Sequence, residues 1–125
     1  MRKYTHEEKA AFIEKMRKRT KKFAVDNINF CHLLPQSTAS RVISYQLIKS
    51  STSTAANYRA SCRARSKKEF HSKISITVEE ADESQYWLEL VKDSNIQCNS
   101  IELERLLSEC SEILAIVTTA RKNNS

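Results

Sequence analysis

The residues best suited to chemistry in this sequence are cationic, and they gather in two stretches. The first stretch, residues 59–73, carries six Lys and Arg against one acid. Tyr58 and Phe70 lie close by, and a basic surface with aromatic side chains is typical of proteins that bind the nucleic-acid backbone. The alternative is a solvated basic turn that serves only solubility. The predicted phosphate-binding residues here are Arg59, Arg63, Arg65, Lys67, Lys68 and Lys73.

The second stretch holds five Lys and Arg among residues 17–22. Five such side chains cannot share one face of a helix with 3.6 residues per turn, so a solvated face is the ordinary interpretation. If the first and third helices of a bundle run parallel, this stretch lies near the level of residues 79–83. Pairing across helices or between subunits stays open, although exposed ion pairs contribute only ~0–1 kcal/mol each. The second predicted phosphate-binding set is Arg17, Lys18, Lys21 and Lys22.

Four carboxylates cluster in residues 79–83. Paired carboxylates can act as general acid and base, and bundle carboxylates can hold two iron ions. A di-iron bundle needs Glu-x-x-His pairs, and no His in this sequence has a Glu three residues before it. We therefore interpret the cluster as ion-pair partners that form, with two aromatic neighbours, a predicted interface: Glu79, Glu80, Glu83, Tyr86 and Trp87.

The two sets of charges allow two functions. We expect Arg59 and Arg63, inside the second helix, to pair with the glutamates of the cluster. Lys67 and Lys68 are expected to contact phosphate oxygens without reading bases, because an exposed turn loses little by leaving them unpaired. The chain is predicted to bind RNA or DNA, or alternatively to act as a structural or interaction module.

The chain has 125 residues and no glycine, which excludes several enzyme classes. Phosphate-binding loops, dinucleotide fingerprints and nucleophile elbows all need glycine. The cysteines, at positions 31, 62, 98 and 110, form no C-x-x-C pair and are predicted to be reduced and metal-free. No enzymatic activity, cofactor or metal is expected. With no run of about 18 apolar residues and no signal-peptide core, a soluble cytoplasmic protein is expected.

The formal charge of +6 is unevenly distributed along the chain. Residues 1–25 carry a net charge of +6 and residues 59–73 carry +5, whereas residues 74–125 carry −6. A chain with one basic and one acidic part suits either anion binding or charge-complementary self-association.

Four amphipathic segments must position these groups. Thr5-His6-Glu7-Glu8 and Ser66-Lys67-Lys68-Glu69 have the form of capping boxes, and a third start signal follows Asn99. The Leu34-Pro35 pair ends the first segment, because the residue before a proline leaves the helical region. We expect helices at about residues 6–33, 38–64, 67–95 and 100–121.

Apolar spacing predicts which helix faces are buried. The first helix has Phe12, Met16, Phe23, Phe30 and Leu34 near heptad spacing, interrupted by Arg19 and Asn27. The third has the most regular stripe, at positions 70, 74, 77, 81, 84, 88 and 91. A second apolar set on that helix, at positions 76, 86, 87 and 90, is surplus to one buried face and indicates an interface.

Residues 50–56 of the second segment are all Ser, Thr or Ala. Alone they look like a linker, but without Gly or Pro they read better as a helix with a small-residue face. Short connections between four long helices then predict one all-α domain over residues 1–125, an up-down-up-down four-helix bundle.

Four elements of the sequence, in order, resemble one protein family. The family pattern has a Q-L-x-(R/K)-S element, an A-N element, an S-x-x-(E/D)-F element and an acidic, aromatic third helix. This chain has residues 46–50, Ala56-Asn57, residues 66–70 and residues 79–90 at those places. Over roughly residues 10–120 it resembles the small bacterial proteins encoded in intervening sequences of large-subunit ribosomal RNA. Residues 60–62 replace an E-G pair of many relatives, so no role of that pair is carried over.

The resemblance implies a four-helix bundle that assembles as a ring-like homopentamer. Similar proteins include the accessory variability determinant of diversity-generating retroelements, a basic pentamer that binds nucleic acid and a reverse transcriptase. The expected partners are therefore further copies of this chain, RNA or DNA, and a reverse transcriptase, but no membrane.

Overall fold

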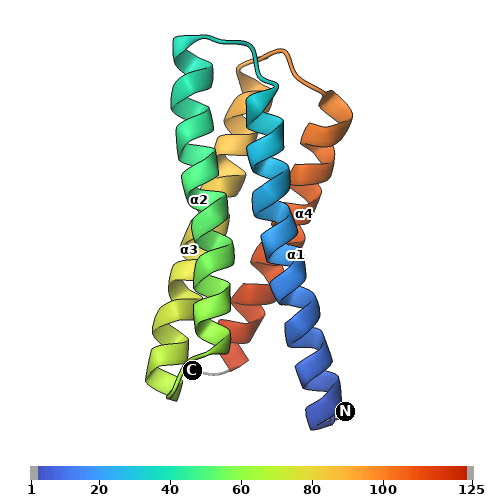
Figure 1. The fold of residues 1–125 in the computed structure, drawn as a ribbon, viewed down its shortest axis with the longest axis vertical. Coiled ribbons are helices and arrows are strands. Elements are labelled where there is room, and N and C mark those ends of the chain that lie inside the picture. The colour runs from blue at the N-terminus through green and yellow to red at the C-terminus, as the bar shows by residue number, and fades with distance from the viewer. Residues whose placement is uncertain (1–2, 124–125) are drawn as a thin grey trace.

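Four helices account for nearly all of the chain. The computed structural model describes residues 3–123, in which α1 spans His6–His32, α2 spans Thr38–Cys62, α3 spans Lys67–Asp93 and α4 spans Ser100–Asn123. They run alternately up and down with short connections (Figure 1). The predicted all-α, up-down-up-down four-helix bundle is confirmed, and each helix begins at the expected residue and ends within two residues of the expected one.

A polar side chain opens each helix. The hydroxyls of Thr5, Ser37 and Ser66 each accept a hydrogen bond of 3.0 Å from the backbone N–H three residues later. The side-chain oxygen of Asn99 does the same for α4, at 3.0 Å from the Glu102 nitrogen. Each cap satisfies a backbone donor that has no partner within the helix. After α3, Asn95 turns the chain with a φ of 55°, a region that Asn tolerates better than most residues.

The α2–α3 contact is the most extensive in the bundle and is lined by small side chains. Ser50, Ser51 and Thr54 are buried on α2, so the tract of residues 50–56 is a helix with a small-residue face, not a linker. The hydroxyl of Ser84 on α3 lies 2.9 Å from that of Ser50, within hydrogen-bonding distance. Small residues at these positions let the two backbones approach closely.

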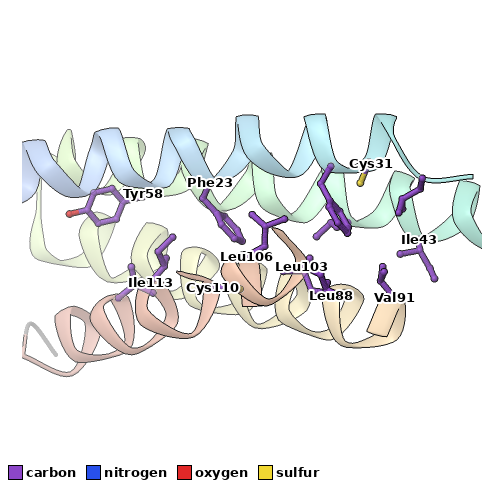
Figure 2. Packing of buried hydrophobic residues seen from close by; sticks show 14 of the residues in the cluster. Phe23, Cys31, Ile43, Tyr58, Leu88, Val91, Leu103, Leu106, Cys110 and Ile113 are labelled. Carbon is purple, nitrogen blue, oxygen red and sulfur yellow. The ribbon is translucent and has the colours of Figure 1, made fainter. Parts of the chain in front are cut away.

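Larger apolar side chains fill the remaining interior (Figure 2). Phe23 projects from α1 towards Leu106 of α4, while Leu88 and Val91 extend the core towards the α1–α2 turn. The predicted α3 stripe is buried from position 74 onwards, and Phe70 is partly buried. The buried hydrophobic positions of α4 are Leu103, Leu106, Cys110, Ile113 and Val117.

Two expectations for the α1 stripe were wrong. Phe12 is 50% exposed, because α1 diverges from α4 towards its N-terminus (Figure 1) and none of residues 6–15 is buried. Asn27, expected to interrupt the stripe, is fully buried, and its amide donates to the Phe23 carbonyl at 2.7 Å. That bond satisfies the amide nitrogen locally, whereas the buried Asn27 Oδ1 has no hydrogen-bond partner among the described residues.

Candidate nucleic-acid interface

The cationic set of residues 59–73 lies at one end of the bundle, and the set of residues 17–22 lies around the middle of α1, where Arg17 adjoins that end. Because the helices alternate in direction, the first half of α1, the last turns of α2, the first turns of α3 and the last turns of α4 share the lower end in Figure 1. We call this end, together with the adjoining cations in the middle of α1, the basic end and define it by its predicted members: Arg17, Lys18, Lys21, Lys22, Arg59, Arg63, Arg65, Lys67, Lys68 and Lys73.

The Cys62 thiol shows how α1 meets α2 at this end. Its pKa is raised mainly by burial, while hydrogen bonds to Tyr58 and Ser61 and the charge of Arg17 oppose the rise. Glu14 also acts on this thiol. The third and fourth turns of α1 therefore lie beside the last turn of α2, and the two cationic sets adjoin.

Most of the predicted cations lack a carboxylate partner. Arg17 pairs with Glu14 at 2.9 Å and Lys22 with Asp26 at 2.7 Å, each one turn away on α1. Arg65, whose side chain is 90% exposed, lies 3.6 Å from Glu69. Within residues 3–123, no ion pair engages the other seven: Lys18, Lys21, Arg59, Arg63, Lys67, Lys68 and Lys73.

The pairing of residues 17–22 with the α3 glutamates, which the sequence left open, does not occur within residues 3–123. α1 packs against α2 and α4, and no contact joins α1 to α3 in the part of the chain that the structure describes. Arg19 instead donates two hydrogen bonds to the Glu109 carboxylate of α4, from Nε at 2.8 Å and from Nη2 at 2.7 Å. Its Nη2 also lies 3.3 Å from Glu112. These hydrogen bonds raise the pKa of the guanidinium. α1 and α3 run parallel but lie diagonally across the bundle, so their side chains do not form ion pairs with one another.

A second cluster joins α1 to α4 and includes Lys22, the predicted cation that lies furthest along α1. Arg105 lies 2.8 Å from Asp26 and 2.7 Å from Glu102. Burial opposes ionisation of Asp26, but hydrogen bonds from Lys22 and Arg105 outweigh it and lower the Asp26 pKa. Lys22 is thereby engaged by Asp26 and is less available to a ligand than the unpaired Lys18 and Lys21.

The predicted interface residues on α3 differ in exposure. Tyr86 is 53% exposed and stacks edge-on against Trp87, with ring centroids 5.1 Å apart. Trp87 is partly buried and packs against the core. The expectation that it forms surplus apolar surface was therefore wrong. Partial burial and the charges of Glu83 and Glu79 raise the Glu80 pKa, against the opposing charge of Lys49. No ion pair engages these three glutamates among residues 3–123.

Sequence reasoning missed cations that the fold adds to the same end. Lys9 and Lys15 are exposed on the first turns of α1, and Arg121 lies in the last turn of α4. Helix direction was the available signal, because an up-down bundle places residues 6–15 and 117–123 at the same end as the α2–α3 turn. Arg63 was expected inside α2 but is its C-terminal cap residue, which places it at the turn itself.

Other kinds of site find little support in residues 3–123. No group of three or more His, Cys, Asp or Glu there could hold a metal ion, and no helix there is long and apolar enough to cross a membrane. The four cysteines are free; Cys31 and Cys110 are buried, whereas Cys62 and Cys98 are partly exposed.

Comparison with known proteins places the fold in a family. Residues 14–119 match the model of the 23S rRNA-intervening sequence protein family. A crystal structure of a protein of unknown function from the S23 ribosomal protein family of Bacteroides thetaiotaomicron shares 28% identity and has a TM-score of 0.79. The match covers 88% of this chain and 97% of that one. No curated protein matches. Neither description names an enzymatic activity, and the chain belongs to the 23S rRNA-intervening sequence protein family.

Proposed function

We propose that this protein is a non-enzymatic binder of nucleic acid that holds phosphate groups at the basic end. One observation carries the proposal: seven of the ten predicted cations have no carboxylate partner in residues 3–123, and five of these seven lie on or beside the α2–α3 turn. Unpaired Lys and Arg are free to neutralise phosphates and release the counterions of the nucleic acid.

The cations at the α2–α3 turn are the best placed for this contact. Lys67 and Lys68 begin α3, both are exposed, and neither forms an ion pair within the described residues. Arg59 and Arg63 are exposed on the last two turns of α2. Such contacts position a backbone without reading its sequence, so we expect affinity with little sequence preference.

The test is a salt titration of binding to a short RNA or DNA. The affinity of the wild type should fall with a log–log slope of about −0.7 to −0.9 per phosphate neutralised. Lys67→Ala with Lys68→Ala should weaken binding to all sequences alike and make the slope shallower by about one for each phosphate that is no longer neutralised. No binding at low salt would refute the proposal.

A matched control removes two charges at the other end of the molecule. Arg41 is exposed at the start of α2, and Lys92 at the end of α3 forms only an exposed pair with Glu104 at 2.9 Å. Arg41→Ala with Lys92→Ala changes the net charge equally but leaves the basic end intact. If this variant lost as much affinity as the first, the binding would reflect net charge alone.

The second candidate function is self-association, which the crowded glutamates of α3 favour. Partial burial and the charges of Glu83 and Glu79 raise the pKa of Glu80, so a cation from another copy would stabilise its ionised form. Arg59 and Arg63 of another copy could supply that charge. We propose this contact as the alternative, with the homopentamer implied by the resemblance as its assembly; the reverse transcriptase partner stays a prediction.

A further inference from the structure

The first turns of α1 splay away from the rest of the bundle (Figure 1). None of residues 6–15 is buried, and Met16 is the first residue of α1 whose side chain is fully buried. Figure 1 shows this segment diverging from α4 at the basic end. The family match begins at residue 14, so most of the segment lies outside the part of the chain shared with the family. We call residues 6–15 the overhang.

The overhang presents apolar side chains to solvent. Phe12 is 50% exposed and Ile13 is 41% exposed. Just before the first turn, the ring of Tyr4 is 63% exposed. An apolar surface of this kind on a small domain indicates a contact with a partner.

The charges around Phe12 indicate which partner fits. Residues three apart on a helix are neighbours, so Lys9 and Lys15 flank the ring one turn to either side. Neither lysine forms an ion pair within the described residues. Of the nearby carboxylates, Glu14 is engaged by Arg17 at 2.9 Å and Glu8 also has an interaction partner. The exposed ring therefore lies between two available cations, next to the unpaired cations of the basic end.

We infer that the overhang binds single-stranded nucleic acid, with an unpaired base stacked on Phe12 while neighbouring phosphates contact Lys9 and Lys15. This inference rests on the proposed function and narrows its substrate class. Bases in a duplex are already stacked and paired, so only a single strand can offer one to the ring. Base stacking on an aromatic side chain tolerates any sequence, because every base has a π face.

The test compares Phe12→Leu with the wild type on a single-stranded oligothymidylate of about 20 nucleotides. Leucine keeps an apolar side chain of high helix propensity but removes the π face. We expect single-strand affinity to fall about five- to a hundredfold. The salt slope should stay unchanged, since every cation that meets a phosphate is retained. Wild type should also bind the single strand more tightly than a duplex of equal length.

Ile13→Ala is the matched control, because it removes exposed apolar surface one residue away without removing a ring. It should leave affinity unchanged. Equal losses in the two variants would indicate a general apolar contact and overturn the stacking. Unchanged affinity in Phe12→Leu, or equal binding of single strand and duplex, would overturn the inference but leave the proposed function standing.

The other possible occupant of the overhang is a second copy of the chain. Light scattering without nucleic acid separates the two: we expect the masses of Phe12→Leu and wild type to be equal. A change in mass would show that the overhang joins copies and would overturn the inference. If wild type binds neither single strand nor duplex at low salt, the proposed function fails first, and the inference fails with it.

Discussion

At the residue scale, Glu80 carries an unfavourable charge. Its folded-state pKa is raised above 4.5 by partial burial and then by repulsion from Glu83 and Glu79. A carboxyl with a raised folded pKa favours the fold in its protonated form. This contribution is fully present below the unfolded pKa and is lost as pH rises through the folded pKa. At neutral pH the ionised Glu80 therefore destabilises the isolated chain.

Glu80→Gln should raise the melting temperature at pH 7, and the gain should vanish below about pH 4.5. Thermal melts across pH would measure it. Glu89→Gln, an exposed position on the same helix, is the control for loss of one negative charge. A lower melting temperature for Glu80→Gln at pH 7 would contradict this prediction and favour an ion pair with another copy.

Thiol reactivity gives a second prediction at this scale. Burial raises the pKa of Cys110 to about 12, and the charges of Asp82 and Glu109 add to the effect. Alkylation requires an accessible thiolate. Under native conditions iodoacetamide should modify Cys62 and Cys98, which are partly exposed, well before Cys110. Peptide mass spectrometry would follow the order, and early labelling of Cys110 would indicate a different packing of α3 on α4.

At the scale of the element, the small-residue face of α2 decides how closely α3 approaches. Ser50 is fully buried, and its hydroxyl lies 2.9 Å from that of Ser84. A larger side chain at this position has no space to occupy. It would force α2 and α3 apart along their most extensive contact.

Ser50→Leu should lower the free energy of unfolding by about 1–3 kcal/mol through overpacking. Ala56→Leu makes a similar enlargement on the exposed side of the same tract and should change stability by less than about 0.5 kcal/mol. Urea unfolding would measure both. If the two variants were equally stable, the close α2–α3 contact would not depend on small side chains.

Helix positions could be predicted from the sequence because caps and apolar spacing are local signals. The hydroxyl of Ser66 and the Leu34-Pro35 pair act within a few residues of their own positions. The partner of Arg19 could not be predicted in this way, since it depends on which helices are adjacent and which are diagonal. The exposure of Phe12 also depends on the angle between α1 and α4, which no local pattern of α1 records.

At the scale of the whole molecule, cations gather at one end and unpaired glutamates lie along α3. The sequence showed that both groups exist, and helix direction could have shown that the two cationic sets meet. It could not show that Arg19 is tied to Glu109 of α4, which removes Arg19 from the available charge. Because the unpaired cations and the unpaired glutamates lie on different parts of the molecule, two surfaces of opposite charge remain to which partners could bind.

The homopentamer is the prediction that belongs to this scale. Light scattering should give a mass near five times 14.4 kDa. If Arg59 and Arg63 pair with glutamates of another copy, Arg59→Ala with Arg63→Ala should reduce that mass or make it depend on concentration. A wild type that stays monomeric at all concentrations would contradict the ring.

The hydroxyl-rich interior has a consequence for the temperature dependence of stability. Nine buried residues of the described chain are polar, among them Ser50, Thr54, Thr77 and Ser84. Exposing apolar surface raises the heat capacity on unfolding, whereas exposing polar surface lowers it. This bundle should therefore have a smaller heat-capacity change than a leucine-filled bundle of the same length. Its free energy of unfolding would trace a flatter curve against temperature, with cold denaturation displaced further below freezing.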